Sequence, residues 1–328
     1  MRAWLSRLPV DTFLLLLVAV VALATVLPAQ GAASGVLSVV TKIVIALLFL
    51  LYGTRLSPQE AWHGVRQWKL HLLVLATTFV AFPLLGLAAR ALVPSILTED
   101  LYAGLLFLCL VPSTVQSSIA FTSMARGHVS AAIVSASLSN IVGVLLTPLL
   151  VLVLMPIGGA PRVDGSAVLD IVLQLLVPFA VGQLLRPWLA PVVTRHAVLT
   201  KVVDRGSVLL VVYAAFSEGM AEHIWSSVRP WRVVAVALVS TALLAIVLAL
   251  TWITARVARL DRGDAIVLLF CGSKKSLASG LPMALVLFPP ATVGLIMLPL
   301  MLFHQIQLFV CAVIASRLGR SAPPVSSG

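Results

Sequence analysis

The sequence predicts an all-α polytopic membrane protein with ten transmembrane helices, arranged as a five-plus-five inverted repeat. The first observation is composition: 61% of the 328 residues are hydrophobic, only 10% are charged, and the mean hydropathy is +1.12. Because a soluble domain carries about 25% charged residues, a water-soluble fold is excluded. The second observation is that apolar runs recur from end to end, and the third is a short segment that occurs twice.

Ten apolar runs follow one another along the chain, each near the length that crosses a bilayer as a helix. They lie at 12–28, 36–54, 70–93, 102–125, 129–156, 166–186, 205–224, 232–255, 264–288 and 291–316. Residues 1–328 are therefore expected to form one integral membrane domain, with a disordered tail at 319–328. The first run, with basic residues before an apolar stretch, also resembles a signal peptide. Asp11 interrupts its charged region, however, and the repeat requires this helix, so we predict an uncleaved first span.

The distribution of Lys and Arg predicts the side of the membrane on which each loop lies. With the N-terminus inside, fifteen of the 22 fall in inside segments, four in outside segments and three within spans. Because cytoplasmic loops are rich in Lys and Arg, both termini are expected in the cytoplasm of a bacterium, with the chain multi-pass in the inner membrane. The net charge of +11 then reflects topology, and no nucleic-acid partner is predicted.

The repeated segment indicates how the two halves are related. "WHGVRQWK" at 62–69 and "WSSVRPWR" at 225–232 share four identical positions, and the last position is basic in both. Five predicted spans separate the copies, and because five is odd the copies lie on opposite faces. This pattern is typical of an inverted-topology repeat, with residues 1–160 as repeat one and 161–318 as repeat two. Chance convergence of interfacial loops on Trp and Arg is the alternative.

The fourth and ninth runs are expected to be broken helices. "VPSTVQSSIAFTSMA" at 111–125 contains Pro112, and "FCGSKKSLASGLPMA" at 270–284 contains Gly272, Gly280 and Pro282. Both also carry a cluster of polar side chains in mid-span. Interrupted helices at corresponding positions of two halves indicate a transporter's binding site, because unwound backbone offers free N–H and C=O groups to a polar substrate.

Four stretches resemble segments of the bile acid:sodium symporter superfamily, in its SBF-like branch. They are "FLLYGTRL", "WKLHLLVLATTFVAFPLLGL", "CGSKKSLASGLPMA" and "FHQIQL". The resemblance covers nearly the whole chain, and the ninth-span motif is its most specific part. It implies a panel domain, from spans 1, 2, 6 and 7, that moves against a core domain. In the core the two broken helices are expected to cross near the bilayer midplane.

The chain departs from the sodium-binding members of that superfamily at two motifs. Their Pro-Gly-Gly-x-x-Ser-Asn pattern corresponds to residues 112–118, where the proline and Ser117 are kept but both glycines and the asparagine are replaced. In span nine the family's glutamate position is Phe270, and its Gln-Asn pair is Lys274-Lys275. The resemblance therefore leaves the coupling ion open between sodium and protons. No other cofactor and no metal site is predicted.

The two lysines are the strongest candidates for function, because an ionisable residue at the centre of a membrane helix costs about 2.5–3.5 kcal/mol. We expect at least one ammonium to face a central cavity, where it would attract an anionic substrate or replace a coupling ion. An interhelical salt bridge or snorkelling is the alternative. Glu218 is a candidate proton carrier. The other candidates, which equally suit helix packing, are Ser113, Thr114, Gln116, Ser117, Ser118, Ser139, Asn140, Ser273, Ser276, His304 and Gln305.

These observations predict a secondary transporter that moves a small solute, an organic anion, by alternating access. Its transport is expected to depend on pH more than on sodium. A channel or a regulatory membrane protein of the same fold is one alternative. An intramembrane hydrolase with a Ser-Lys pair in "GSKKS" is another, but no second nucleophile motif or oxyanion-hole signature accompanies it. The expected partners are a small-molecule substrate and the lipid bilayer, while homodimerisation is left open.

Overall fold

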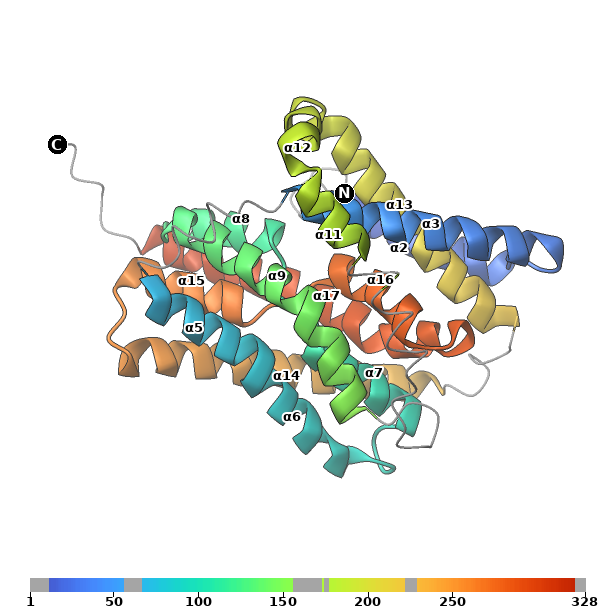
Figure 1. Cartoon of the computed structure of the whole chain (residues 1–328). Helices are drawn as coiled ribbons and strands as arrows, with labels where there is room; N and C mark the ends of the chain where they lie inside the picture. Colours follow the sequence, from blue (N-terminus) through green and yellow to red (C-terminus); the bar gives the residue numbers. More distant parts are fainter. Residues whose placement is uncertain (1–11, 56–66, 156–172, 174–176, 222–228, 322–328) are drawn as a thin grey trace, which may run out of the picture.

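A computed structural model describes residues 12–55, 67–155, 173, 177–221 and 229–321, and the elements in these ranges are helical (Figure 1). The first half contains α2 (Thr12–Val26), α3 (Ala32–Arg55), α5 (Trp68–Ala76), η2 (Thr77–Ala81), α6 (Phe82–Ala88), η3 (Ala89–Leu92), α7 (Glu99–Leu110), α8 (Gln116–Met124) and α9 (Val129–Leu154). The second half contains α11 (Val177–Leu184), α12 (Arg186–Arg195), α13 (Ala197–Ala221), α14 (Pro230–Val257), α15 (Arg262–Gly272), α16 (Leu277–Leu287) and α17 (Pro290–Arg320).

Five helical stretches within the described residues are long and apolar enough to cross a membrane. They are Ala32–Thr54, Trp68–Leu92, Val129–Leu154, Pro230–Val257 and Thr292–Arg320. The all-helical membrane class is thus confirmed, while the ten-helix count and the inverted repeat stay predictions. Of the predicted sixth span, residues 166–172 and 174–176 lie outside the described residues. Two boundaries were wrong: α13 begins eight residues before the predicted 205, and α17 runs two residues into the predicted tail.

The predicted fourth span is broken, as its proline suggested. α7 ends at Leu110 and α8 begins at Gln116, so residues 111–115 lie between two half-helices. The cause is local, because Pro112 cannot donate a backbone hydrogen bond and keeps the preceding residue out of the helical region. Val111 accordingly has ψ 156°.

The predicted ninth span is also broken, but not at all of the predicted breakers. α15 ends at Gly272, and α16 begins after Ser276, whose hydroxyl accepts the Ser279 N–H as an N-cap. Pro282, by contrast, lies inside α16, so its assignment as a breaker was wrong. A proline within a helix leaves the carbonyl four residues earlier without its partner. Here that carbonyl belongs to Ala278, and it accepts the Tyr52 hydroxyl of α3 at 3.3 Å.

Gly280 was also predicted to break the helix, and this was wrong because it too lies within α16. Its role is close packing: a Cβ at this position would lie 2.7 Å from a methyl carbon of Leu300 in α17. Such a distance is shorter than real Cβ contacts allow. A small residue in a membrane helix lets neighbouring helices approach closely, and this requirement outweighs the modest helix-breaking tendency of a single glycine.

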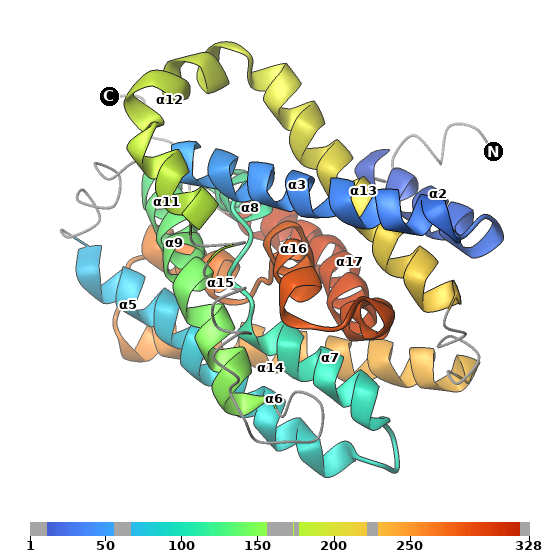
Figure 2. The same ribbon diagram turned by 45° about the vertical axis from the view of Figure 1, so that its right-hand side comes forward.

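The helices gather into two groups, which Figures 1 and 2 show from two directions. α13 packs against α2 and α3, and α3 packs against α11, while α13 also contacts α16 and α17 of the other group. The approach of α3 and α11 is very close. A Cβ at Gly53 would lie 2.2 Å from the Phe179 carbonyl oxygen, and one at Gly182 would lie 2.1 Å from that of Leu50. These glycines let the two backbones touch.

Candidate functional site

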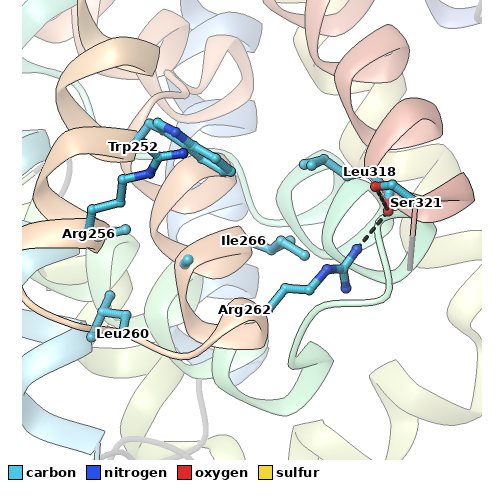
Figure 3. Close-up of a pocket in the computed structure, with 9 residues that line it drawn as sticks. Trp252, Arg256, Leu260, Arg262, Ile266, Leu318 and Ser321 are labelled. Atoms are coloured by element: carbon cyan, nitrogen blue, oxygen red, sulfur yellow. Dashed lines mark hydrogen bonds between the residues drawn. The ribbon is translucent and has the colours of Figure 1, made fainter. Parts of the chain in front are cut away.

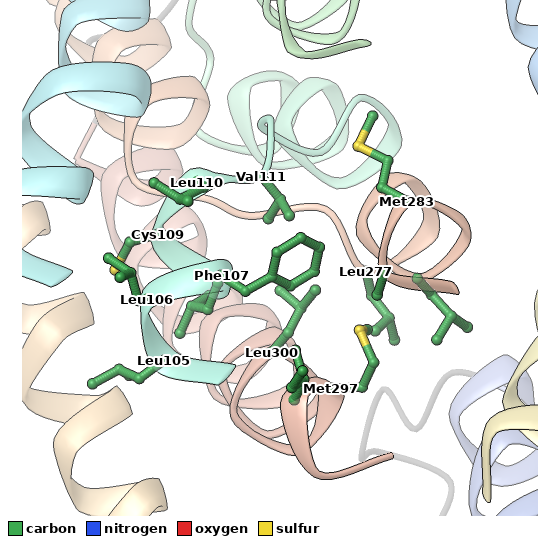
Figure 4. Close-up of a cluster of buried hydrophobic side chains, with 14 of the residues drawn as sticks. Leu105, Leu106, Phe107, Cys109, Leu110, Val111, Leu277, Met283, Met297 and Leu300 are labelled. Atoms are coloured by element: carbon green, nitrogen blue, oxygen red, sulfur yellow. The ribbon is translucent and has the colours of Figure 1, made fainter. Parts of the chain in front are cut away.

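The two helix breaks lie against each other. The Ser276 N–H donates to the Pro112 carbonyl at 2.8 Å, and the Ser113 hydroxyl donates to the Cys271 carbonyl at 2.6 Å. In Figure 4 the end of α7 lies beside the stretch that leads into Leu277. Residues about 160 positions apart thus form one junction, and we call residues 111–115 and 273–276 the crossing.

The crossing satisfies backbone groups that the breaks would leave without partners. The Leu110 carbonyl accepts the Thr147 hydroxyl, and the Ser113 carbonyl accepts the Asn140 side-chain amide, both at 2.8 Å. On the other half-helix, the Phe270 carbonyl accepts the Ser118 hydroxyl at 3.2 Å. Because an unsatisfied backbone group in a membrane interior costs several kcal/mol, these hydroxyls and amides are part of what makes the breaks stable.

Lys275 lies at the centre of this arrangement, with a fully buried side chain. Its ammonium donates to three backbone carbonyls: that of Thr78 at 2.9 Å, and those of Cys109 and Val111 at 2.8 Å. Three donors are all that an ammonium has. The Phe82 ring lies 4.1 Å away, centroid to Nζ, which adds a cation–π contact. The cation also lies at the C-terminal end of α7, where the helix dipole favours positive charge.

Each of the three carbonyls is available for a structural reason. The Thr78 carbonyl lies in the π-helical turn η2, where the Phe82 N–H donates to the carbonyl of Thr77 instead. The next residue is Pro83, which has no N–H to donate. The Cys109 carbonyl would normally bond the N–H of Ser113, but that N–H donates to the Ser139 hydroxyl at 3.1 Å. The Val111 carbonyl lies in the extended stretch after α7.

The backbone of Lys275 is fixed by α17. The Lys275 N–H donates to the Gln307 side-chain oxygen at 2.9 Å, and the Gln307 amide donates back to the Lys275 carbonyl at 2.8 Å. His304 Nδ1 lies 2.9 Å from that amide and 3.4 Å from the same carbonyl. This two-point contact holds the unwound residue in one orientation, so that its side chain reaches the carbonyls of α7 and η2.

Lys274 is also fully buried, but its surroundings differ. Its Nζ lies 3.8 Å from the ring centroid of Phe121 in α8 and 5.4 Å from that of Phe270 in α15. Within the described part of the chain it has no hydrogen-bond partner. Cation–π contacts contribute about 2 kcal/mol when desolvated, whereas the loss of hydration of a buried charge costs more. Lys274 is therefore a buried amine that its neighbours only partly compensate.

A polar network extends from the crossing toward less buried positions. The Thr114 hydroxyl lies 2.7 Å from that of Ser117 and 3.1 Å from that of Ser118. The Asn140 side chain accepts the Ser279 hydroxyl at 2.8 Å and so joins α9 to α16. Ser117 and Asn140 are partly exposed and Gln116 is exposed, whereas the polar residues of the crossing itself are buried.

The remaining sequence candidates divide into those at the crossing and those away from it. Ser273 donates to the Leu269 carbonyl of its own helix at 2.5 Å. Gln305 is half-buried, and no hydrogen bond joins it to the crossing within the described residues; the neighbouring Gln307 makes that contact instead. Glu218 falls in the last turn of α13, and its side chain lies outside the described residues.

A separate charged cluster joins the loop before α9 to the start of α15. His128 Nδ1 lies 2.8 Å from an Asp264 oxygen and 3.8 Å from an Asp261 oxygen. The hydrogen bond to Asp264 raises the pKa of His128 above its usual value. One ligand atom of each residue lies within 4.8 Å of the others, which is close enough for the three to hold a metal ion. The Asp264 hydrogen bond and the N-cap formed by Asp261 already explain the cluster.

Comparison with known proteins identifies the family. The family described as "SBF-like CPA transporter family" matches residues 11–320. The chain belongs to this family. A Pseudomonas aeruginosa protein of uncharacterized activity is 51% identical over 94% of the chain and 93% of its own length. The Escherichia coli protein named "Putative symporter YfeH" is 46% identical over 94% and 93%. Sodium/bile acid cotransporter 7 of Danio rerio is 25% identical over 94% of both chains.

The resemblance found in the sequence is thus confirmed, and this SBF-like protein is a membrane transporter rather than an enzyme. The surroundings of the two lysines also do not match the Ser-Lys pair that the hydrolase alternative requires. Lys275 donates to carbonyls, and Lys274 bonds no hydroxyl within the described residues, so neither lysine is paired with a serine there.

Proposed function

We propose that this protein is a secondary active transporter that moves a small organic anion by alternating access, with the ammonium of Lys275 in the place of a coupling cation. The family and the transporter names of its relatives support the general activity. The observation that carries the specific proposal is the cage of three backbone carbonyls around Lys275.

A ring of oxygens pointed at one positive group is the usual way in which proteins bind a small cation. Here the positive group is covalently attached. A sodium ion 4 Å from an ammonium would be repelled by about 4 kcal/mol at an effective dielectric of 20. In addition, Phe270 provides no side-chain oxygen where sodium-binding relatives have a glutamate. The residues present at this cage therefore do not fit a sodium ion.

Lys274 is the residue that can change its state during transport. Within the described residues it has no hydrogen-bond partner, so loss or gain of a proton, or approach of a substrate anion, breaks no hydrogen bond to them. The first turns of α8 and α16 begin at the crossing, and helix N-termini favour negative charge. The partly exposed Ser117 and Asn140 offer hydrogen bonds beside them. This arrangement suits a carboxylate and supports uptake that depends on pH more than on sodium.

The ten-helix topology is part of the same proposal. Five spans separate the two copies of the Trp-Arg segment, so the copies lie on opposite faces. The bias of Lys and Arg then assigns residues near 66 to the cytoplasm and residues near 229 to the outside. Single cysteines introduced at these two positions should react from opposite sides of the membrane with an impermeant maleimide. Reaction from one side only would exclude the inverted repeat.

The proposed coupling is tested in proteoliposomes with taurocholate and a series of smaller monocarboxylates as probes. We expect uptake to be driven by an imposed pH gradient and to continue when choline replaces sodium. Uptake that stops in choline at constant pH would exclude the proposed coupling. Ion conductance without gradient-driven accumulation of any probe would favour a channel of the same fold.

A further inference from the structure

Arginines from three helices gather at one end of the molecule. Arg256 lies in the last turn of α14, Arg262 begins α15, and Arg317 and Arg320 lie in the last turn of α17. Arg259 lies in the loop between α14 and α15. Within the described ranges, none of the five forms an ion pair with a carboxylate. The positive charge at this end is therefore not neutralised by the part of the chain that the structure describes.

The two carboxylates in the same stretch are already engaged. Asp261 accepts the Asp264 N–H at 2.9 Å as the N-cap of α15. Asp264 bonds His128 at 2.8 Å. Within the described residues neither carboxylate pairs with one of these arginines, so an anion that approaches from outside would meet arginines that have no carboxylate partner there.

A hollow of about 320 Å³ opens among these helix ends (Figure 3). On one side of it, the Arg256 guanidinium lies over the Trp252 ring, 5.2 Å from the centroid. On the other side, Arg262 donates to the carbonyls of Leu318 at 2.6 Å and Ala125 at 3.2 Å. Arg262 thus joins the ends of α8 and α17, while the Arg256 guanidinium makes no hydrogen bond within the described residues.

We propose that this hollow binds the phosphate group of an anionic phospholipid from the surrounding bilayer. Trp252 is the kind of residue that lies at the depth of the lipid head groups, and basic pockets between membrane helices bind such head groups. Arg256 supplies the free charge. Leu260, Ile266 and Leu318 line the hollow as well and offer an apolar wall to the first carbons of an acyl chain. The proposal is independent of the transported substrate and of the roles of the lysines.

The chain provides a matched control for Arg256. At the other end of α14, Arg232 lies over Trp231 at the same centroid distance of 5.2 Å, but it does not line the hollow. Arg256→Gln and Arg232→Gln therefore remove the same charge and the same cation–π contact at opposite ends of one helix. A difference between them reports the hollow and not the general attraction of arginine to anionic lipid.

The test is native mass spectrometry of the full-length protein in detergent, titrated with phosphatidylglycerol or with phosphatidylcholine. We expect the wild type and Arg232→Gln to bind phosphatidylglycerol with equal affinity, more tightly than phosphatidylcholine. Arg256→Gln should bind phosphatidylglycerol about fivefold more weakly, because one arginine at a membrane surface contributes about 1 kcal/mol. Equal losses in the two variants, or equal binding of the two lipids by the wild type, would overturn the proposal.

Free phosphate is the other source of the same chemical group, and it is tested by competition. Inorganic phosphate at millimolar concentration should leave the bound phosphatidylglycerol in place, because it lacks the acyl chains that contact the apolar wall. If phosphate displaces the lipid from the wild type but not from Arg256→Gln, the hollow is a site for soluble phosphate and the lipid assignment is wrong.

Discussion

Lys274 and Lys275 are adjacent, identical in type and both fully buried, yet they lie in opposite chemical surroundings. Lys275 has three carbonyl partners at 2.8–2.9 Å. Lys274 lies between two phenylalanine rings and has no hydrogen-bond partner in the described part of the chain. The difference teaches that burial of a lysine in a membrane protein does not define its role. The number of hydrogen-bond partners distinguishes the two lysines, and on this ground we propose that Lys275 stabilises the fold while Lys274 changes its state.

The backbone break makes this difference possible. Both lysines lie in the four-residue stretch between α15 and α16, where side chains need not follow helical spacing. The stretch directs Lys275 toward α7 and η2, and Lys274 toward α8 and its own half-helix.

The largest expected effect comes from Lys275→Met, which keeps the size of the side chain but removes the cation. Three buried carbonyls then lose their donor, and each unsatisfied group costs about 1–3 kcal/mol. We expect the free energy of unfolding to fall by about 3 kcal/mol or more, measured as the midpoint of thermal unfolding in detergent. Lys42→Met is the control, because Lys42 is exposed on α3. Equal midpoints for both variants would show that the cage does not stabilise the fold.

Lys275→Ala extends this test to the proposed replacement of a coupling ion. Shortening the side chain leaves space among the three carbonyls, so sodium should raise the unfolding midpoint of this variant while choline should not. The wild-type midpoint should be the same in both salts. A sodium effect of equal size in the wild type would show that a sodium site exists beside the intact lysine.

Lys274→Met should have the opposite pattern. Replacing a poorly compensated buried charge with an apolar side chain is often neutral or stabilising, by about 1–4 kcal/mol. We therefore expect the unfolding midpoint to be kept or raised. Gradient-driven uptake should lose its pH dependence, because the titrating group is gone. A destabilised variant with an unchanged pH profile of uptake would assign the structural role to Lys274 and reverse the comparison.

Substitutions in the polar network should have smaller effects, and they should distinguish a role in stability from a role in transport. Ser276→Leu removes the N-cap of α16 and should lower the free energy of unfolding by about 1 kcal/mol. It should also impair transport. Ser117→Leu, at a partly exposed position, should impair uptake and leave the unfolding midpoint nearly unchanged. Thermal unfolding and proteoliposome uptake, measured on both variants, test this. Full activity in both would place the transport path elsewhere.

The smallest effect concerns His128, which provides a reference for any pH dependence. The hydrogen bond to Asp264 raises the pKa of His128, so protonated histidine stabilises the fold. This contribution is complete below the ordinary value of 6.5 and is lost as the pH rises through the raised value. Because the side chain is half exposed, the effect should stay below about 1 kcal/mol.

His128→Gln should remove that small dependence of stability on pH, observed as unfolding midpoints measured from pH 5 to 9. The same variant should keep the pH dependence of uptake, which we assign to Lys274. A flat uptake profile in His128→Gln would move the titrating group from the crossing to the loop before α9.

The sequence by itself determined the class of the protein, its family and the positions where two helices break. Composition excluded a soluble fold, and Pro112 and Gly272 lie at the observed breaks because proline and glycine act through local backbone geometry. The same reasoning named Lys274 and Lys275 as candidate site residues, and both lie in the break between α15 and α16. It misplaced Pro282, because the cost of a proline inside a helix depends on whether another group reaches the freed carbonyl, and Tyr52 does so.

Only the tertiary structure decided which lysine has partners. The Thr78 carbonyl that binds Lys275 lies 197 residues away in the chain, and it is free because a π-helical turn precedes Pro83. The rings around Lys274 come from two different half-helices, and Gln307, not the neighbouring Gln305, fixes the backbone of Lys275. Residue types indicate that a buried charge needs compensation. Every residue carries a backbone carbonyl, however, so only the packing of the helices determines which carbonyls become the partners.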